Sequence, residues 1–497
     1  MRLYKSWLFI FFIFFVQQAT ADVVAHFNRI KSDPNALYAF LKNMPKGGEL
    51  HYHLAGGAYP ETMVALAAQG NYCLNKNTLA LNKTVELCHG VKSSDIYSQP
   101  ELYHQIIRAW SLKDFVAGQE SSHDHFFASF FKFMQIVADF RPQLLAEIIK
   151  RAASQQTLYL EVMILPDNAH SASFAHLIQN ATSFAEKKRL LLTHPEFKKN
   201  IQHTITESAR ILKETRQILG CDKNPHLPAC KVTVKFQYYI LREQAPDNMF
   251  AQAVNAFAAA SASPDLVGVN LVQAEDGIIS LRDYRMHMQV MQFLHQIYPN
   301  VHISLHAGEM APTAVSPEDL RFHIHDAIFT GHAERIGHGV DIAYENQAER
   351  IVQYMAECPI PVEINLISNQ KILQISGKNH PLLYYLAHHV PVVLSTDDEG
   401  ILRTDLTQQY VEAVMTHGIG YHKLKTINRN ALTYSFLPGK SIWKDAKHSL
   451  PIAACENLEN PTCLEFIKTN EKARIQWQLE KQLSAFEKSF AASHEFT

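Results

Sequence analysis

The chain has no excess of charge of either sign. Lysine and arginine together number 46, aspartate and glutamate number 48, and the formal net charge is -2 over 497 residues. Such a balance gives no general electrostatic attraction to nucleic acid or to an anionic membrane surface. The sequence also lacks long runs of like charge, internal repeats and low-complexity segments. With 47% hydrophobic residues, it is instead suited to forming a large core, and we expect no nucleic-acid partner.

The N-terminal apolar run is too short to cross a membrane as a helix, which takes about 20 apolar residues. It covers residues 7–16, follows two basic residues and precedes the small-residue triplet at 19–21. This three-part layout is typical of a secretory signal peptide, whereas a membrane anchor is the alternative. We therefore expect removal of residues 1–21 before Asp22, no membrane segment in the mature protein, and a secreted or periplasmic location.

Cysteine is scarce, and six of the seven cysteines fall into pairs that are close in sequence. The pairs are Cys73 with Cys88, Cys221 with Cys230, and Cys455 with Cys463. Each pair brackets a polar segment, which in an exported protein favours local disulfides over free thiols, the alternative for any of them. The seventh, Cys358, stands in an apolar stretch, and we expect it to be buried as a small hydrophobic residue.

Short β-branched runs alternate with longer segments of helical periodicity. The candidate strands cover residues 48–54, 157–164, 232–240, 266–272, 301–307, 335–340, 361–367 and 390–396. Eight strands separated by helices predict a parallel (β/α)8 barrel. An open doubly wound sheet is the alternative, but no glycine-rich phosphate-binding turn follows the first strand.

The parts outside the strands extend this barrel without forming a second domain. We expect a single domain over 22–497, with the barrel at about 45–420, a helical lead-in at 22–44 and helices over 420–497. The stretch from Gly70 to Pro100 is predicted to be an excursion between the first strand and the helices that follow it.

Polar side chains lie where several of the predicted strands end. They are His51 and His53 on the first strand, His306 and Glu309 at the fifth, His338 at the sixth, and Asp397 and Asp398 at the eighth. In this fold the carboxyl ends of the strands form the active site. We therefore expect these residues, which are far apart in sequence, to lie close together.

A metal site follows from the residue types and their spacing. Side chains alternate along a strand, so His51 and His53 point to the same side. With His306 and Asp397 they form a set of three imidazoles and one carboxylate, which suits zinc. In a chain with 27 histidines a single His-Xaa-His pair can arise without function. The occurrence of all the motifs at strand ends, in order, gives the set its weight.

Four ordered motifs carry a family resemblance. "MPKGGELHYHLAGG", "SLHAGE", "RIGHG" and "LSTDDEG" resemble the successive signatures of the adenosine deaminases within the amidohydrolase superfamily. The paired cysteines, the export signal and "EINLISNQ" make the chain more similar to the secreted, growth-factor-related branch. The resemblance covers roughly residues 44–402.

The resemblance implies an activity and a role for each residue. It implies one zinc ion per chain, held by His51, His53, His306 and Asp397. Glu309 is implied to be the proton donor, and His338 is implied to orient the attacking hydroxide. The implied substrate-binding residues are Asp398, Gln273 and Gly308. The implied reaction is hydrolytic deamination of adenosine, and of 2'-deoxyadenosine, to inosine and ammonia. A carboxyl group that faces a purine ring nitrogen must carry the shared proton, so we expect a raised pKa for Asp398.

Two other hydrolase types do not fit the sequence. The fourth predicted strand ends in "GVNLVQAED" without lysine, so the bridging residue of two-metal enzymes on this fold is missing. The Pro-Cys-Xaa-Xaa-Cys motif of the cytidine deaminases is absent as well.

Three departures from the family pattern concern the substrate. Ala55 replaces the usual ribose-contacting aspartate, Gln273 replaces a glycine, and Glu399 replaces a proline. They leave open a deaminase of another adenine-type base or modified nucleoside, and a secreted binding or growth-factor-like protein without turnover. A homodimer formed through the N-terminal helices is an expectation from the resemblance alone.

Overall fold

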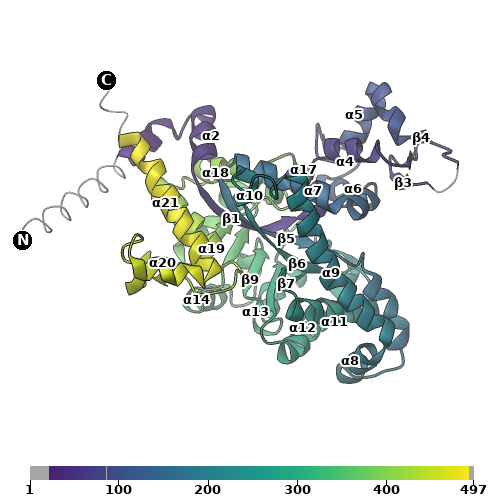
Figure 1. The fold of residues 1–497 in the computed structure, drawn as a ribbon. Helices are drawn as coiled ribbons and strands as arrows, with labels where there is room; N and C mark the ends of the chain where they lie inside the picture. Colours follow the sequence, from purple (N-terminus) through teal and green to yellow (C-terminus); the bar gives the residue numbers. More distant parts are fainter. Residues whose placement is uncertain (1–21, 85–86, 492–497) are drawn as a thin grey trace, which may run out of the picture.

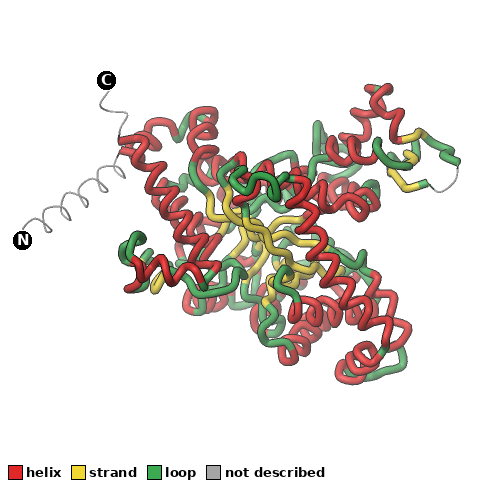
Figure 2. The backbone as a smooth tube through the Cα atoms, viewed as in Figure 1, coloured by secondary structure: helices red, strands yellow, loops and turns green. Residues whose placement is uncertain are grey.

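Eight parallel strands form a nearly closed barrel at the centre of the molecule (Figures 1 and 2). This computed structural model describes residues 22–84 and 87–491, so the signal peptide expected at 1–21 lies outside the described residues. In order around the barrel, the strands are β1 (Lys46–His53), β5 (Thr157–Ile164), β6 (Thr233–Leu241), β7 (Leu266–Val272), β8 (His302–Ala307), β9 (Arg335–His338), β10 (Val362–Ile364) and β11 (Val392–Leu394). The predicted (β/α)8 barrel is confirmed, and the open sheet is excluded.

The barrel closes between its first and last strands through backbone contacts at their carboxyl ends. Tyr52 forms a parallel bridge with Asp397. The amide of His53 donates to the carbonyl of Asp397 at 3.2 Å, and the amide of Asp397 donates to the carbonyl of His51 at 3.2 Å. Two predicted site segments therefore form the seam of the barrel.

The strands are apolar because helices cover the outside and side chains fill the inside. All eight residues of β5 are buried, as expected for a strand that has no solvent-facing side. The strands β10 and β11 are shorter than predicted, with three residues each. The chain after β10 turns at Asn365 into α15 (Leu366–Ile372), which ends the strand early.

Helices connect successive strands and extend both ends of the barrel. The main connecting helices are α7 (Met134–Ser154), α9 (Pro195–Ile218), α11 (Pro246–Ala262), α12 (Ile278–Ile297), α13 (His323–Phe329), α14 (Ala348–Glu357), α16 (Leu382–Ala387) and α19 (Tyr421–Thr433). Further helices are α3 (Leu54–Gly57), α4 (Pro60–Ala67), α5 (Pro100–Ala109), α6 (Ser122–Phe130), α8 (Phe184–Thr193), α10 (Pro228–Lys231), α17 (Glu399–Leu402) and α18 (Leu406–Met415). Within the described part of the chain, no helix combines the length and the apolar character that a membrane crossing needs.

The predicted excursion between β1 and the following helices is present. Here β2 (Tyr72–Leu74), β3 (Leu81–Lys83) and β4 (Val91–Lys92) form a small sheet in the order β3-β2-β4. In Figure 1 this sheet and α5 project away from the barrel. A separate sheet of this size has little core of its own, and a disulfide between Cys73 and Cys88 ties it together.

The two terminal regions pack against each other beside the barrel. Residues 22–30 are helical and are followed by α2 (Pro34–Asn43). Phe40 of α2 contacts Phe486 and Phe490 of α21 (Glu471–Ala491), with ring centroids 5.2 and 5.4 Å apart, and Figure 1 shows α2 near one end of α21. The C-terminal region is not wholly helical as expected, because β12 (Trp443–Asp445) and β13 (Leu450–Pro451) form an antiparallel hairpin before α20 (Pro461–Lys468).

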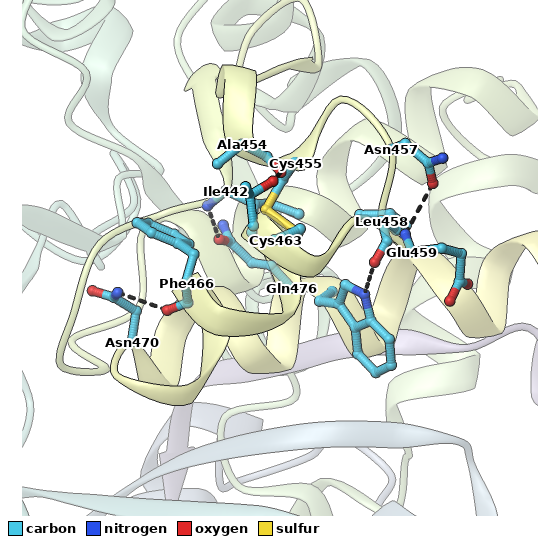
Figure 3. Close-up of a disulfide and its surroundings, with 12 residues drawn as sticks. Ile442, Ala454, Cys455, Asn457, Leu458, Glu459, Cys463, Phe466, Asn470 and Gln476 are labelled. Atoms are coloured by element: carbon cyan, nitrogen blue, oxygen red, sulfur yellow. Dashed lines mark hydrogen bonds between the residues drawn. A yellow bond between two sulfur atoms is a disulfide. The ribbon is translucent and has the colours of Figure 1, made fainter.

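All three expected disulfides are present, and they indicate an oxidising compartment such as the periplasm or the extracellular space. Figure 3 shows the bond between Cys455 and Cys463. These two cysteines belong to a small apolar cluster with Ile442, Ile467 and Ala473, separate from the main core.

The expectation for Cys358 was wrong, because its side chain is exposed. Cys358 is the C-cap residue of α14. The buried face of that helix consists of Ile351, Val352 and Met355, and the chain leaves the helix before this face repeats.

We predict that replacing both Cys455 and Cys463 by alanine destabilises the C-terminal cluster. Closing a loop of this length, with a sequence separation of 8, contributes about 2.5 kcal/mol in the chain-entropy model. Denaturant unfolding, with limited proteolysis to locate the loosened region, measures the effect. The matched control is Cys358→Ala, which removes an exposed thiol. An equal loss of stability in the control would contradict the prediction.

Candidate active site

Four predicted metal-ligating side chains meet at the carboxyl ends of three strands. His51 and His53 lie on the same side of β1, His306 comes from β8, and Asp397 follows β11. One nitrogen or oxygen atom from each of them lies within 4.8 Å of the others. We call this group the four-donor cluster. The intervening Tyr52 points to the other side, where its hydroxyl donates to Glu399 at 2.6 Å.

The geometry of the four-donor cluster fits a divalent cation. The Nε2 atoms of His53 and His306 are 3.2 Å apart, and Oδ1 of Asp397 lies 3.4 Å from Nε2 of His51 and 3.3 Å from Nε2 of His53. Nε2 of His51 is buried and has no hydrogen-bond partner. Buried polar atoms are rarely left without a partner, and three imidazoles with one carboxylate are ligands that zinc prefers.

Outer partners orient the ligands of the four-donor cluster. Nδ1 of His51 bonds Glu363 at 2.8 Å, Nδ1 of His306 bonds Asn270 at 2.9 Å, and Ser368 donates to Asp397 at 2.7 Å. Such contacts leave the opposite ring nitrogen free to face a metal. We did not predict these three partners. The polar residues Asn270 and Glu363 inside otherwise apolar strands were a signal that could have found them.

Glu363 is held as an anion by its own neighbours. Arg335 donates to its Oε1 at 2.6 Å and Ser304 at 2.9 Å. Burial would raise the pKa of Glu363, but the charge of Arg335 and the contact with His51 lower it to about 2. A fixed anion behind His51 favours the tautomer that carries its proton on Nδ1, so that Nε2 faces the cluster as a lone pair.

The backbone takes unusual conformations where the site residues lie. Asp397 and His338 both have positive φ angles, of 66° and 69°, and so does Gly308, at 75°. Non-glycine residues rarely adopt this region, and such strain is concentrated at functional sites. At Gly308 a side chain is also excluded, since a Cβ would lie 2.4 Å from Asp341.

Glu309 and His338 lie beside the four-donor cluster. Nε2 of His338 is 3.6 Å from Oε1 of Glu309 and 3.8 Å from Oδ2 of Asp397. Burial, together with the nearby Asp397, raises the pKa of Glu309 to about 8. Burial and the neighbouring His51 lower the pKa of His338 to about 3. At neutral pH the carboxyl group therefore carries a proton and the imidazole is uncharged.

Asp398 is buried directly after the cluster residue Asp397. As expected, its pKa is raised well above the usual range, first by burial and second by the charge of Asp397. Its Oδ1 has no hydrogen-bond partner. The raised pKa favours the protonated form of Asp398, in which the carboxyl group is able to donate a hydrogen bond.

A chain of hydrogen bonds sets the proton position on His338. The amide of Leu382 donates to Nδ1 of His380 at 3.1 Å, Nε2 of His380 bonds Oδ1 of Asn369 at 3.0 Å, and Nδ2 of Asn369 bonds Nδ1 of His338 at 2.9 Å. Because a backbone N–H can only donate, neutral His380 must carry its proton on Nε2. The same reasoning along the chain places the proton of His338 on Nε2, which faces the cluster.

We predicted a role for neither Asn369 nor His380. Asn369 belongs to the motif "EINLISNQ" and follows the predicted strand 361–367 by two residues, whereas His380 stands well beyond that strand. Burial, reinforced by His417, lowers the pKa of His380 to about 3, so it stays uncharged and its donor and acceptor positions do not change.

Two predicted substrate-binding residues have their polar groups engaged elsewhere. The side-chain oxygen of Gln273 accepts from the amide of Glu243 at 2.8 Å. The amide of Gly308 donates to Glu275 at 3.0 Å, and Glu275 also accepts from the amide of Glu309 at 2.8 Å. Gln273 therefore holds the chain at Glu243, whereas the buried Glu275 holds the loop of Gly308 and Glu309 in place.

The two other departures from the family pattern are Glu399 and Ala55, and of these only Ala55 lines a cavity. Glu399 bonds Tyr52 at 2.6 Å and Arg151 at 2.9 Å on the outer side of β1. Ala55, in contrast, lines a cavity of about 280 Å³ beside His53. Of the three departures, only Ala55 is among the residues that line this cavity.

His123 of α6 contacts the part of the chain that follows β7. Nε2 of His123, on α6, is 3.2 Å from Asp276, which follows β7. Burial would lower the pKa of His123, but Asp276 and, to a smaller extent, Glu309 raise it to about 9. His123 is therefore paired with Asp276, a contact that the sequence pattern "HDHFF" does not reveal.

The sequence comparisons point to one enzyme family. The sequence profile of the family described as Adenosine deaminase matches residues 110–444. The adenosine deaminase of Edwardsiella ictaluri is 34% identical over 149 residues, which are 29% of this chain and 41% of that protein. An adenosine deaminase of Klebsiella pneumoniae is 36% identical over 137 residues, or 27% and 38% of the two chains. The aligned region thus spans about two fifths of these curated relatives.

Solved structures share the fold. The adenine deaminase from Arthrobacter aurescens has a TM-score of 0.54 at 17% identity, covering 88% of this chain and 98% of that one. The Arabidopsis N6-mAMP deaminase has a TM-score of 0.52 at 19% identity, covering 82% and 97%. Arabidopsis ADAL complexed with IMP has a TM-score of 0.55 at 16% identity, covering 90% and 99%. At these identities the likeness shows a shared fold alone.

We predict that a divalent cation stabilises the protein through the four-donor cluster. Because the ligands converge only in the folded chain, a cation at a thousandfold excess over its Kd stabilises it by about 4 kcal/mol. Thermal unfolding before and after removal of metal by a chelator measures this difference. The double variant His53→Ala, Asp397→Asn should lose it.

The control for this experiment is His422→Ala, which removes an exposed histidine far from the cluster in sequence. It should respond to the cation as the unmodified protein does. If the double variant keeps the full metal-dependent stabilisation, the cluster is not the binding site.

Proposed function

Because the chain belongs to the adenosine deaminase family, we propose that it hydrolyses adenosine, and 2'-deoxyadenosine, to inosine and ammonia. One observation carries the proposal. A protonated carboxyl group, that of Glu309, and an uncharged imidazole, that of His338, lie 3.6 Å apart beside the four-donor cluster. This arrangement provides a proton donor and a hydrogen-bond donor on the same side of one metal site.

We propose that His51, His53, His306 and Asp397 hold one zinc ion. Zinc in such a site supplies Lewis acidity that activates water as a nucleophile near neutral pH. A four-ligand set of this composition is suited to zinc and to a single ion.

The positions of Glu309 and Asp398 determine the orientation that we propose for the purine. Glu309, which is protonated at neutral pH, donates its proton to ring nitrogen N1, and this neutralises the charge that develops as water adds to the adjacent carbon C6. Asp398 donates its own proton in a hydrogen bond to N7. The proton of the added hydroxyl group then passes to the amino group, which leaves as ammonia and so yields the aromatic 6-oxo product. The other proton of the water returns Glu309 to its acid form.

His338 positions the attacking oxygen. Its Nε2–H, set by Asn369 and His380, donates to that oxygen and directs a lone pair toward C6. Since burial keeps the pKa of His338 low, this role does not require the imidazole to become charged. We therefore assign Asn369 and His380 as positioning residues for His338.

Other substrates stay as alternatives on specific grounds. Ala55 changes the surface beside the cluster, which favours a search among other adenine-type bases and modified nucleosides. A secreted binding protein without turnover is disfavoured, because binding alone does not require Glu309 or His338.

We also propose that the chain is exported as a single domain, 22–497, after cleavage before Asp22. The three disulfides support an oxidising destination. Assembly as a homodimer through the N-terminal helices stays a prediction.

We predict that Glu309→Gln lowers kcat for adenosine about a thousandfold, which is within the range for loss of a general acid. The amide retains the size of the side chain but cannot transfer the proton. Ammonia release measures turnover, and elemental analysis should find the same zinc content as in the unmodified protein. Glu349→Gln on α14 is the control. Turnover within tenfold of the unmodified enzyme would count against the assignment of Glu309.

We predict that Asn369→Asp lowers kcat by up to about ten-thousandfold with little change in KM, the effect seen when a catalytic histidine is held in the wrong tautomer. A carboxylate cannot donate to Nδ1 of His338, so the proton moves to Nδ1 and Nε2 loses its donor role. His380→Gln retains a donor to Asn369 and should keep most activity, whereas His380→Leu should not. Equal activity in the two His380 variants would contradict this chain of contacts.

A further inference from the structure

The cavity beside the four-donor cluster lies over the ends of β1, β5 and β6. It has a volume of about 280 Å³, and its walls include Ala55, Leu165 and Tyr239 together with Val137 and Ala138 of α7. The ring of Tyr239 has its centroid 6.4 Å from that of His53. The cavity is therefore next to the cluster and is large enough for a sugar-sized group.

The cavity lies on the side of the site where Asp398 stands. Ala55 is followed by Gly56, and a Cβ on Gly56 would lie 1.8 Å from Oδ1 of Asp398. Burial raises the pKa of Tyr239 to about 12, and Asp398 adds to this shift while Arg141 opposes it. Asp398 therefore lies against Gly56, the residue that follows Ala55 of the cavity wall.

The position of Asp398 determines which part of a purine nucleoside faces the cavity. This step rests on the proposed function, in which Asp398 meets N7 and Glu309 meets N1. N7 and N9 belong to the same five-membered ring, so the sugar on N9 also lies on the Asp398 side. The cavity is then the place of the sugar and its 5' substituent.

The lining of the cavity is mainly apolar. Val137, Ala138, Ile164 and Leu165 contribute hydrocarbon, and Ala55 offers a methyl group where a carboxylate would accept hydroxyl protons. Burying a hydroxyl group without a partner costs free energy, whereas burying an apolar group is favourable. The lining therefore favours an apolar substituent.

The cavity has no cation that is available for a phosphate. Among the described lining residues, the one basic side chain is Arg141. Its Nη1 donates to the carbonyl of Ala138 at 3.2 Å, and its Nη2 donates to the carbonyl of Leu165 at 2.8 Å and to Asn168. Glu207 lies 3.6 Å from the guanidinium and balances its charge. A phosphate dianion would thus enter an apolar cavity beside buried carboxyl groups.

We propose that this cavity selects uncharged adenine nucleosides whose 5' position carries an apolar group, such as a 5'-deoxy-5'-alkylthio group, and rejects nucleoside 5'-monophosphates. This preference belongs to the sugar side of the site and is separate from the chemistry at C6. The proposal therefore specifies which adenine nucleosides are the substrates of the proposed deamination.

The first test compares ammonia release from adenosine, 5'-deoxy-5'-methylthioadenosine and adenosine 5'-monophosphate. We expect kcat/KM for the methylthio compound to be about tenfold above that for adenosine, the gain from burying one small apolar group. For the monophosphate we expect a value at least about a hundredfold below adenosine, because its charge is desolvated without a partner. A methylthio compound no better than adenosine, or a monophosphate equal to it, would overturn the proposal.

A binding experiment separates this proposal from the proposed function. Calorimetry with the corresponding 6-oxo products, 5'-methylthioinosine, inosine and inosine 5'-monophosphate, reports the order of affinities without any turnover. If no compound releases ammonia but the products bind in the expected order, the deaminase assignment fails and the cavity assignment stands. If ammonia is released but the order is reversed, the cavity assignment fails alone.

Variants of the cavity wall provide the second test. Ala138→Leu fills part of the cavity, and we expect it to lower kcat/KM for the methylthio compound about tenfold more than for adenosine. Ala55→Asp introduces an acceptor for hydroxyl groups and should reverse the preference between these two substrates. Lys150→Leu, at an exposed position of the same helix α7, is the control and should leave the ratio unchanged. An unchanged ratio in both cavity variants would overturn the proposal.

Discussion

The closure of the barrel between β1 and β11 is the constraint on which the site depends. The same backbone contacts that join these strands place Asp397 beside His51 and His53. A shift of one residue in this pairing would turn both histidines to the other side of β1, because side chains alternate along a strand. The register of the seam and the assembly of the four-donor cluster are therefore one structural condition. Outer partners such as Glu363 and Asn270 then limit each ring to one orientation.

Much of this architecture could be predicted from the sequence because it is local. Each barrel strand is a short β-branched run, and the alternation rule places His51 and His53 together without knowledge of the fold. The reactive residues also stand at strand ends, which the barrel brings together. The contacts of Asn369 and His380 could not be predicted this way, since they depend on how a loop and a short helix pack, which no periodicity encodes. The exposure of Cys358 was missed for a related reason: its apolar neighbours in sequence lie on a helix that ends just before it.

The two ends of the site are built by different forces. Around His338 the proton positions are set by directional hydrogen bonds. The amide of Leu382 fixes the proton of His380, His380 orients Asn369, and Asn369 fixes the proton of His338. In the cavity beside Ala55 the walls are mostly apolar, and apolar packing is non-directional and tolerates exchange of side chains of similar size. A substitution around His338 removes a hydrogen-bond donor or acceptor. A substitution in the cavity wall beside Ala55 changes the shape and polarity of the cavity gradually.

This difference explains why family membership and substrate preference have separate origins in the chain. The residues of the four-donor cluster come from the ends of barrel strands, whose positions are set by the closed sheet. The cavity wall and His123 come largely from the segment between β1 and β5, which also carries the projecting excursion in Figure 1. Packing on the rim of the barrel can vary there without disturbing the seam. A family signature at the strand ends therefore determines the reaction more closely than the substrate, and the residues that choose the substrate must be identified from the cavity itself.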